Sequence, residues 1–233
     1  MPEPIDRRSA RPGLAVTPSQ EQRRAARHAM LAMAARRQRP GAGSVLRELR
    51  RQGSQTMQWW QSAVALLQER GIEVGVAGAV AANAYMPPRY TADLDLALRL
   101  ADLAAATNVL RGAGWALIGQ LELYEGLEGS AWRTPEGSEL DLIGLPGAWG
   151  DQAIAAAQRN VVADLPTLPL EDIVVAKLIS ARPQDTADIS RMLGGSDVEH
   201  LEPVRAAVRR WRPADLEDLE QMIVAGRLEY GGP

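Results

Sequence analysis

Two short segments of this chain alternate acidic residues with leucines, which limits what they can form. Residues 91–98 read TADLDLAL, and residues 138–143 read SELDLI. Successive side chains of a strand point to opposite faces of a sheet, so each segment is predicted to be a strand with one carboxylate face and one apolar face. The chain is therefore expected to fold around a sheet that buries leucines on one face and holds acidic groups on the other.

The first of these strands places Asp93 and Asp95 on the same face. Repulsion between two ionised carboxylates about 5 Å apart costs about 3 kcal/mol at an effective dielectric constant near 20, so a cation is expected between them. The chain has no cysteine and two histidines, so a metal would rest mainly on oxygen ligands. Mg²⁺ is the expected ion, with Mn²⁺ as its alternative. A surface pair of aspartates with no metal is the simpler interpretation.

The second strand places Glu139 and Asp141 on one face. If the two strands are neighbours, Asp141 can join Asp93 and Asp95 as the third carboxylate of a metal site. Such a site suits in-line phosphoryl or nucleotidyl transfer, in which metal ions activate the attacking oxygen and neutralise the leaving phosphate. The alternative is a solvated sheet edge whose acidic residues keep it soluble.

The remaining patterns predict an α+β protein, with a mixed sheet flanked by helices and followed by a helical C-terminal region. The expected core, residues 56–168, lies between an arginine-rich, partly disordered and partly helical arm (1–55) and that helical region (169–233). Further strands are expected at 72–76, 115–119, 121–125 and 130–134. Helices are expected at 20–38, 57–70, 79–85, 101–110 and 151–159, and in most of the chain from residue 170 onward.

Charge is distributed unevenly along the chain. Residues 1–53 hold twelve arginines and four acidic residues, a balance of +8, so a net charge of −3 leaves −11 on the remainder. Arginines gain by displacing counterions from phosphates, which indicates a nucleic acid such as RNA as partner of the arm; a solvated tail is an equally good interpretation. No segment has the length of a membrane helix or the pattern of a signal peptide, so no membrane partner and a cytoplasmic location are expected.

Ala77-Gly78-Ala79 lies where a strand is expected to turn into a helix. Backbone N–H groups at such a turn can face a triphosphate, and a glycine lets the phosphate approach closely. Tight packing of the strand on the helix would also account for Gly78. The segment matches neither the P-loop nor the dinucleotide-binding pattern.

Four separated elements together resemble those of nucleotidyltransferases. Residues 76–83 (VAGAVAAN) and 86–96 (MPPRYTADLDL) are similar to their glycine-containing loop and D-x-D strand. Residues 168–189 (LPLEDIVVAKLISARPQDTADI) are similar to the K-x4-R segment and following aspartate of the AbiEii-like group, toxins of type IV toxin–antitoxin and abortive-infection systems. The resemblance covers roughly residues 72–192. Ala79 departs from the family's usual Gly-Ser or Gly-Gly and removes a hydroxyl that could bind phosphate.

The resemblance implies a nucleotidyltransferase-like fold and a metal-dependent enzyme that moves a nucleotidyl group from an NTP to an acceptor hydroxyl. Asp93, Asp95 and Asp141 would be its catalytic residues and metal ligands. The nucleotide-binding set would be Gly78, Ala79, Arg89, Thr91, Lys177, Arg182, Asp185 and Asp188. Within it, Lys177 and Arg182 would hold phosphates, and Arg89 would either reach a phosphate or pair with Asp93.

Lys177 is also notable without the resemblance, because it is the only lysine among 26 lysines and arginines. A lysine is a compact charge that suits a phosphate in a tight site, although it could equally cap a helix face. For Arg182, Asp185 and Asp188 the alternative is an exposed ion-pair network between adjacent helices.

Transfer RNA is the acceptor that the toxin resemblance and the basic arm favour, with a protein hydroxyl or an antibiotic as the others. A cognate antitoxin is the implied protein partner. Two other functions compete with the enzyme. One is a degenerate nucleotidyltransferase fold that binds nucleotide or partner without turnover, which Ala79 favours. The other is an arginine-rich nucleic-acid-binding module with a structural acidic domain.

Overall fold

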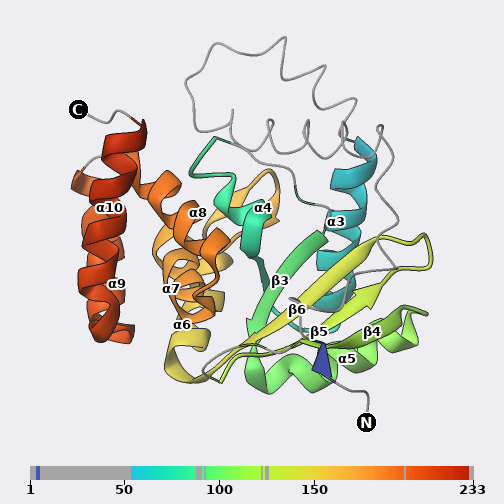
Figure 1. Cartoon of the computed structure of the whole chain (residues 1–233). Coiled ribbons are helices and arrows are strands. Elements are labelled where there is room, and N and C mark those ends of the chain that lie inside the picture. Colours follow the sequence, from blue (N-terminus) through green and yellow to red (C-terminus); the bar gives the residue numbers. More distant parts are fainter. Residues whose placement is uncertain are drawn as a thin grey trace.

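The computed structural model describes residues 4–5, 54–87, 91, 93–121, 123, 126–196 and 198–230. A six-stranded mixed sheet lies on one side of the molecule and a block of helices on the other (Figure 1). The strand order is β1 (Pro4–Ile5), β4 (Ala116–Leu121), β5 (Glu128–Arg133), β6 (Glu139–Leu145), β3 (Asp93–Arg99) and β2 (Val74–Val76). Pairs β1–β4 and β3–β6 are parallel and the others are antiparallel. The predicted α+β class is confirmed.

The central strands β3 and β6 carry the core of the sheet. The leucines of the two alternating segments are fully buried, as predicted: Leu94, Leu96, Leu140 and Leu142. Helices α3 (Ser54–Gln68), α5 (Leu103–Gly112) and α6 (Gly147–Ala157) contact the sheet. A small hairpin, β7 (Val161–Val162) and β8 (Leu165–Pro166), connects α6 to the helical block.

The helical C-terminal region is also confirmed. It consists of α7 (Leu170–Ser180), α8 (Pro183–Gly194), α9 (Val198–Trp211) and α10 (Leu216–Tyr230). Helix α7 packs on α8 and α9, and α8 packs on α10. The short helix α4 (Gly78–Ala82) lies between this block and the sheet and contacts both α7 and β3 (Figure 1). No helix in the described ranges is long and apolar enough to cross a membrane.

Several predicted boundaries differ from the structure. Helix α4 ends at Ala82 instead of residue 85, because the N–H groups of Ala84 and Tyr85 bond three residues back and tighten the chain into turns. Helix α6 begins four residues earlier than expected, directly after Pro146. Of the strand expected at 121–125, Leu121 belongs to β4 and Leu123 to no strand, while residues 122, 124 and 125 lie outside the described residues.

The N-terminal arm was expected to be disordered over its first residues, which is wrong for Pro4–Ile5. These two residues pair with Gln120 and Leu121 of β4 as an edge strand, a position that tolerates a proline because one row of N–H groups there has no ladder partner. The helix predicted at 20–38 lies outside the described residues.

Helices α8 and α10 cross at backbone contact. A Cβ atom at Gly226 would overlap the carbonyl of Ser190, and one at Gly194 would overlap the backbone of Gly226. Both glycines are buried. Only glycine permits this approach, so the crossing fixes α10 against α8.

We expect Gly226→Ala to lower the free energy of unfolding by about 1–3 kcal/mol through overpacking, although alanine is the better helix former by about 1 kcal/mol. Gly195→Ala is the matched control, because a Cβ there meets nothing within 4 Å. Urea unfolding of both variants measures the difference. Equal stability of the two would contradict the close crossing.

A buried carboxyl joins α6 to α7. Trp149 donates its indole N–H to Asp172 Oδ1 at 3.0 Å, and both side chains are buried. Burial raises the pKa of Asp172 to about 6 from its ordinary 3.8; the Trp149 hydrogen bond opposes this shift and the charge of Glu171 adds to it. The folded protein therefore binds this proton more strongly than the unfolded chain does.

Stability linked to Asp172 should fall as pH rises from about 4 through 6, because the folded-state pKa is the higher one. The free energy of unfolding of Asp172→Asn minus that of wild type should therefore rise by about 1 kcal/mol from pH 5 to pH 8. Urea unfolding at the two pH values measures this gain. The exposed Asp218→Asn is the control and should show none; a flat difference for Asp172→Asn would refute the coupling.

Candidate active site

The parallel pairing of β3 with β6 brings the predicted carboxylates together. Asp95 lies in register with Asp141, and Asp93 lies in register with Glu139. Paired residues of neighbouring strands, about 4.8 Å apart, point to the same face of a sheet. Asp95 and Asp141 are 8% and 2% exposed, so they do not lie on a solvated edge. The condition on which Asp141 could join the site, that the strands are neighbours, is met.

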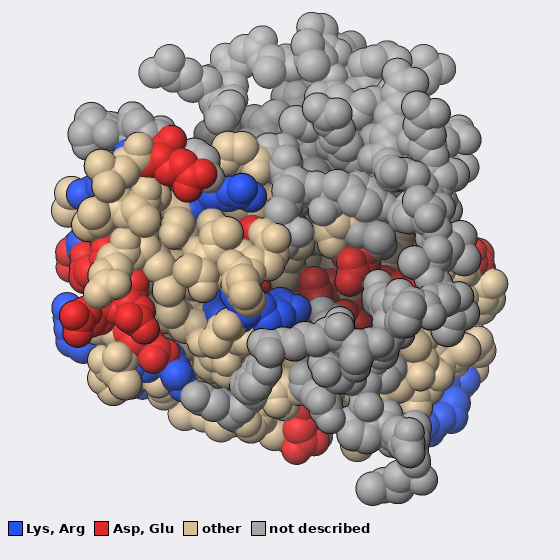
Figure 2. Space-filling view, viewed as in Figure 1, with Lys and Arg blue, Asp and Glu red and all other residues tan. Residues whose placement is uncertain are grey.

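The outer carboxylates each have a partner at the edge of this face. Thr91 donates its hydroxyl to Asp93 Oδ1 at 3.0 Å. Arg133, at the end of β5, donates to Glu139 Oε1 at 3.1 Å. In Figure 2 acidic side chains lie near the middle of one face of the molecule, next to a basic group. The half-buried outer pair and the buried inner pair thus lie on one face of the sheet.

Gly78 packs directly against Asp95. Its φ of +58° is in the left-handed region, and a Cβ atom at this position would overlap the Asp95 carboxylate. Ala77 donates its N–H to the backbone oxygen of Asp95 at 2.9 Å. Close packing therefore accounts for this glycine. Ala79 follows as a buried residue of the five-residue helix α4, and its assignment to a nucleotide site stays a prediction.

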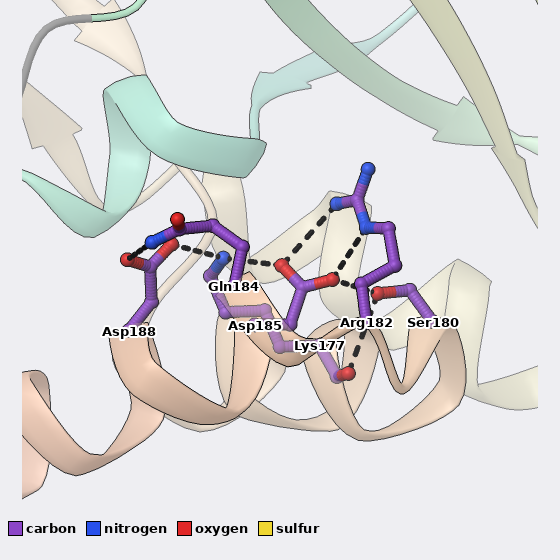
Figure 3. Close-up of polar contacts among 6 residues, drawn as sticks. All are labelled: Lys177, Ser180, Arg182, Gln184, Asp185 and Asp188. Carbon is purple, nitrogen blue, oxygen red and sulfur yellow. Dashed lines mark hydrogen bonds and ion pairs between the residues drawn. The ribbon is translucent and has the colours of Figure 1, made fainter. Parts of the chain in front are cut away.

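The K-x4-R segment forms an ion-pair network between α7 and α8 (Figure 3). Lys177 Nζ lies 2.8 Å from Asp185 Oδ1 and 2.8 Å from Asp188 Oδ2. Arg182 donates to the two oxygens of Asp185 at 2.6 and 3.2 Å, and Ser180 donates its hydroxyl to the same carboxylate. The expected alternative, an ion-pair network, is present; Lys177, Asp185 and Asp188 are buried in it, whereas Arg182 is partly exposed.

The network shifts the pKa values of its members. Burial alone would raise the pKa of Asp185, but the hydrogen bond from Arg182 and the charges of Lys177 and Arg182 outweigh it and hold that pKa at about 2. Burial disfavours the charge on Arg182, yet Asp185 foremost, with the charges of Asp95 and Asp188, raises the pKa of Arg182. Arg182 therefore lies within electrostatic range of Asp95, which connects the network to the carboxylate face.

The metal assignment stays a prediction, and the residues can be compared with what Mg²⁺ needs. Within the described ranges, no group of three or more Asp, Glu, His or Cys side chains is arranged to hold a metal ion. The in-register pair of Asp95 and Asp141 still fits Mg²⁺, because this ion is commonly held by one or two carboxylates and completes its shell with water and substrate phosphate. That Asp93, Asp95 and Asp141 are its ligands stays a prediction.

Three polar partners of the site were not predicted from the sequence. Ser180 and Gln184 belong to the ion-pair network, where Gln184 donates to Asp188 Oδ1 at 3.0 Å. Their helical spacing to Lys177 and Asp188 was the available signal. Arg133 became visible only through the register of β5 with β6. Arg89 lies outside the described residues.

No protein-family model matches this sequence, and no curated protein shows significant similarity to it. Among solved structures, the antibiotic-resistance factor ANT(2″)-Ia is similar. Its solution structure has 19% identity and a TM-score of 0.44 over 76% of this chain and 94% of that chain. A crystal structure of ANT(2″)-Ia in complex with adenylyl-2″-tobramycin has 19% identity and a TM-score of 0.44 over 76% and 99%.

We expect Gly78→Ala to lower the free energy of unfolding by about 1–3 kcal/mol more than Gly114→Ala. Both glycines have positive φ, but a Cβ at Gly114 meets nothing within 4 Å whereas one at Gly78 meets Asp95. The penalty of Gly78→Ala should shrink in an Asp95→Ala background. Chemical denaturation of Gly78→Ala, Gly114→Ala, Asp95→Ala and the Gly78→Ala/Asp95→Ala double variant measures both differences. A penalty that is unchanged in the Asp95→Ala background would show that the glycine is not required by Asp95.

Proposed function

We propose that this chain is a metal-dependent nucleotidyltransferase that moves a nucleotidyl group from an NTP to an acceptor hydroxyl. The observation that carries the proposal is the buried, in-register pair of Asp95 and Asp141, next to Gly78 and within electrostatic range of Arg182. Two ionised carboxylates on neighbouring strands repel each other, and a divalent cation bound between them would relieve this repulsion.

Each residue has a defined task in this proposal. Asp95 and Asp141 would hold Mg²⁺, or Mn²⁺ in its place, with Asp93 as a further ligand and Asp141 as ligand or base. When bound, the metal would neutralise charge on the transferring phosphate. Arg182 would bind a phosphate oxygen beside Asp95, with its guanidinium oriented by Asp185. Thr91 would orient Asp93 through its hydroxyl.

RNA is the proposed acceptor class, and transfer RNA the candidate within it. The support is the balance of +8 on residues 1–53, opposite in sign to the rest of the chain. The likeness of residues 168–189 to the AbiEii-like group supports a toxin–antitoxin role with a cognate antitoxin. A second candidate function is nucleotide binding without turnover, which Ala79 favours because it leaves the loop without a hydroxyl.

Asp95→Asn should reduce nucleotidyl transfer by about 100-fold or more, because it removes a charge that holds the metal at the reacting phosphate. Its melting temperature, measured alongside, separates a loss of transfer from a loss of folding. The assay incubates purified protein with Mg²⁺, each labelled NTP in turn and total RNA, and follows label transfer and pyrophosphate release.

The control is Asp151→Asn, an exposed aspartate near Arg99 at the other end of β3, which should transfer label at the wild-type rate. Mg²⁺-dependent nucleotide binding without transfer in wild type would favour the second candidate function. If Asp95→Asn is as active as wild type, the assignment of the carboxylates is wrong. Removal of residues 1–53 should weaken RNA binding and leave NTP binding intact.

A further inference from the structure

Lys177 is enclosed by its own ion pairs. Its side chain is 6% exposed, and its ammonium group lies 2.8 Å from carboxylate oxygens of both Asp185 and Asp188, whose side chains are 1% and 0% exposed. Two of its three N–H donors are therefore engaged, and little of the side chain is open to a substrate phosphate. A phosphate that replaced either aspartate would take from a buried carboxylate the cation that neutralises it, which is unfavourable.

Arg182 has the opposite environment. Its side chain is 41% exposed, and two of its nitrogens are held by the two oxygens of Asp185. Its remaining terminal nitrogen points away from the network and has no bond to the other residues drawn in Figure 3. The fork geometry of the guanidinium allows it to keep the Asp185 pair on one side and to bind a phosphate on the other.

We propose that Lys177 is a positioning residue that never contacts the nucleotide. Its charge balances Asp185 and Asp188, so that Asp185 holds the partly exposed Arg182 guanidinium in place, and Arg182 alone of the two cations binds substrate phosphate. The phosphate-binding half of this inference rests on the proposed function. It also accounts for a lysine in an arginine-rich chain, because a compact ammonium fits between two carboxylates that a guanidinium would spread apart.

The test uses charge compensation. Lys177→Met removes the cation and leaves Asp185 and Asp188 to repel each other, so it should lower the melting temperature. The repulsion should also displace Asp185 and with it Arg182, which Asp185 holds. Lys177→Met combined with Asp188→Asn restores the charge balance and leaves the Arg182–Asp185 pair intact. Calorimetric titration with MgATP, MgGTP, MgCTP and MgUTP, below each variant's melting temperature, measures nucleotide affinity.

We expect Arg182→Gln and Lys177→Met each to weaken nucleotide binding by about 10-fold, the worth of one charge-assisted hydrogen bond. The double variant should recover most of the melting temperature and bind nucleotide within about 3-fold of wild type, which a phosphate-binding lysine would not allow. A double variant that melts like wild type and still binds about 10-fold more weakly would overturn the proposal.

Two further outcomes separate this inference from the proposed function. If wild type binds none of the four nucleotides, the proposed function fails, and the melting temperatures alone decide whether Lys177 is a counter-ion. Recovery in the double variant then supports that role, and absence of recovery refutes it. If Lys177→Met has the same melting temperature as wild type, the counter-ion role is wrong. If Lys177→Met does not fold, folding of the double variant supports the proposal.

Discussion

The parallel pairing of β3 with β6 is the constraint on which the candidate site depends. It sets Asp95 beside Asp141 and Asp93 beside Glu139, and it turns the four leucines between them toward the core. A slip of one residue in this register would turn leucines toward the site and carboxylates into the core, so burial of the leucines fixes the position of the acidic residues. The same interaction therefore stabilises the fold and assembles the site.

Long-range packing completes what this pairing begins. Strands β4 and β5 separate β3 from β6 along the chain, yet β6 returns to lie next to β3. Helix α4 presses Gly78 onto Asp95 on one side and contacts α7 on the other. Helices α7 and α8 position Arg182 so that its charge interacts with Asp95 of the sheet. The backbone crossing of α8 with α10 holds α8 in place.

Local pattern was enough to predict β3 and β6, their two faces and the helical C-terminal region, because alternation and helical spacing are properties of short segments. It could not predict that β3 and β6 are neighbours, since pairing depends on the path of β4 and β5. Nor could it predict that Asp185 and Asp188 are buried. Both lie on a helix of ordinary polar composition, and their burial follows from packing among α7, α8 and the helices that cover them.

Buried carboxyl groups lie at several places in the described fold, and their surroundings distinguish a structural role from a functional one. Burial raises the pKa of Asp172, but this carboxyl accepts a hydrogen bond from Trp149 that joins two helices, so its role is in their packing. Asp185 and Asp188 are buried with cations, so they are neutralised within the chain. Asp95 and Asp141 are buried side by side, Gly78 packs at positive φ against Asp95, and the charge of the partly exposed Arg182, which is paired with Asp185, interacts with Asp95. A divalent cation bound by the two carboxylates could also bind a substrate phosphate, which is why the metal and the phosphate are proposed at this place.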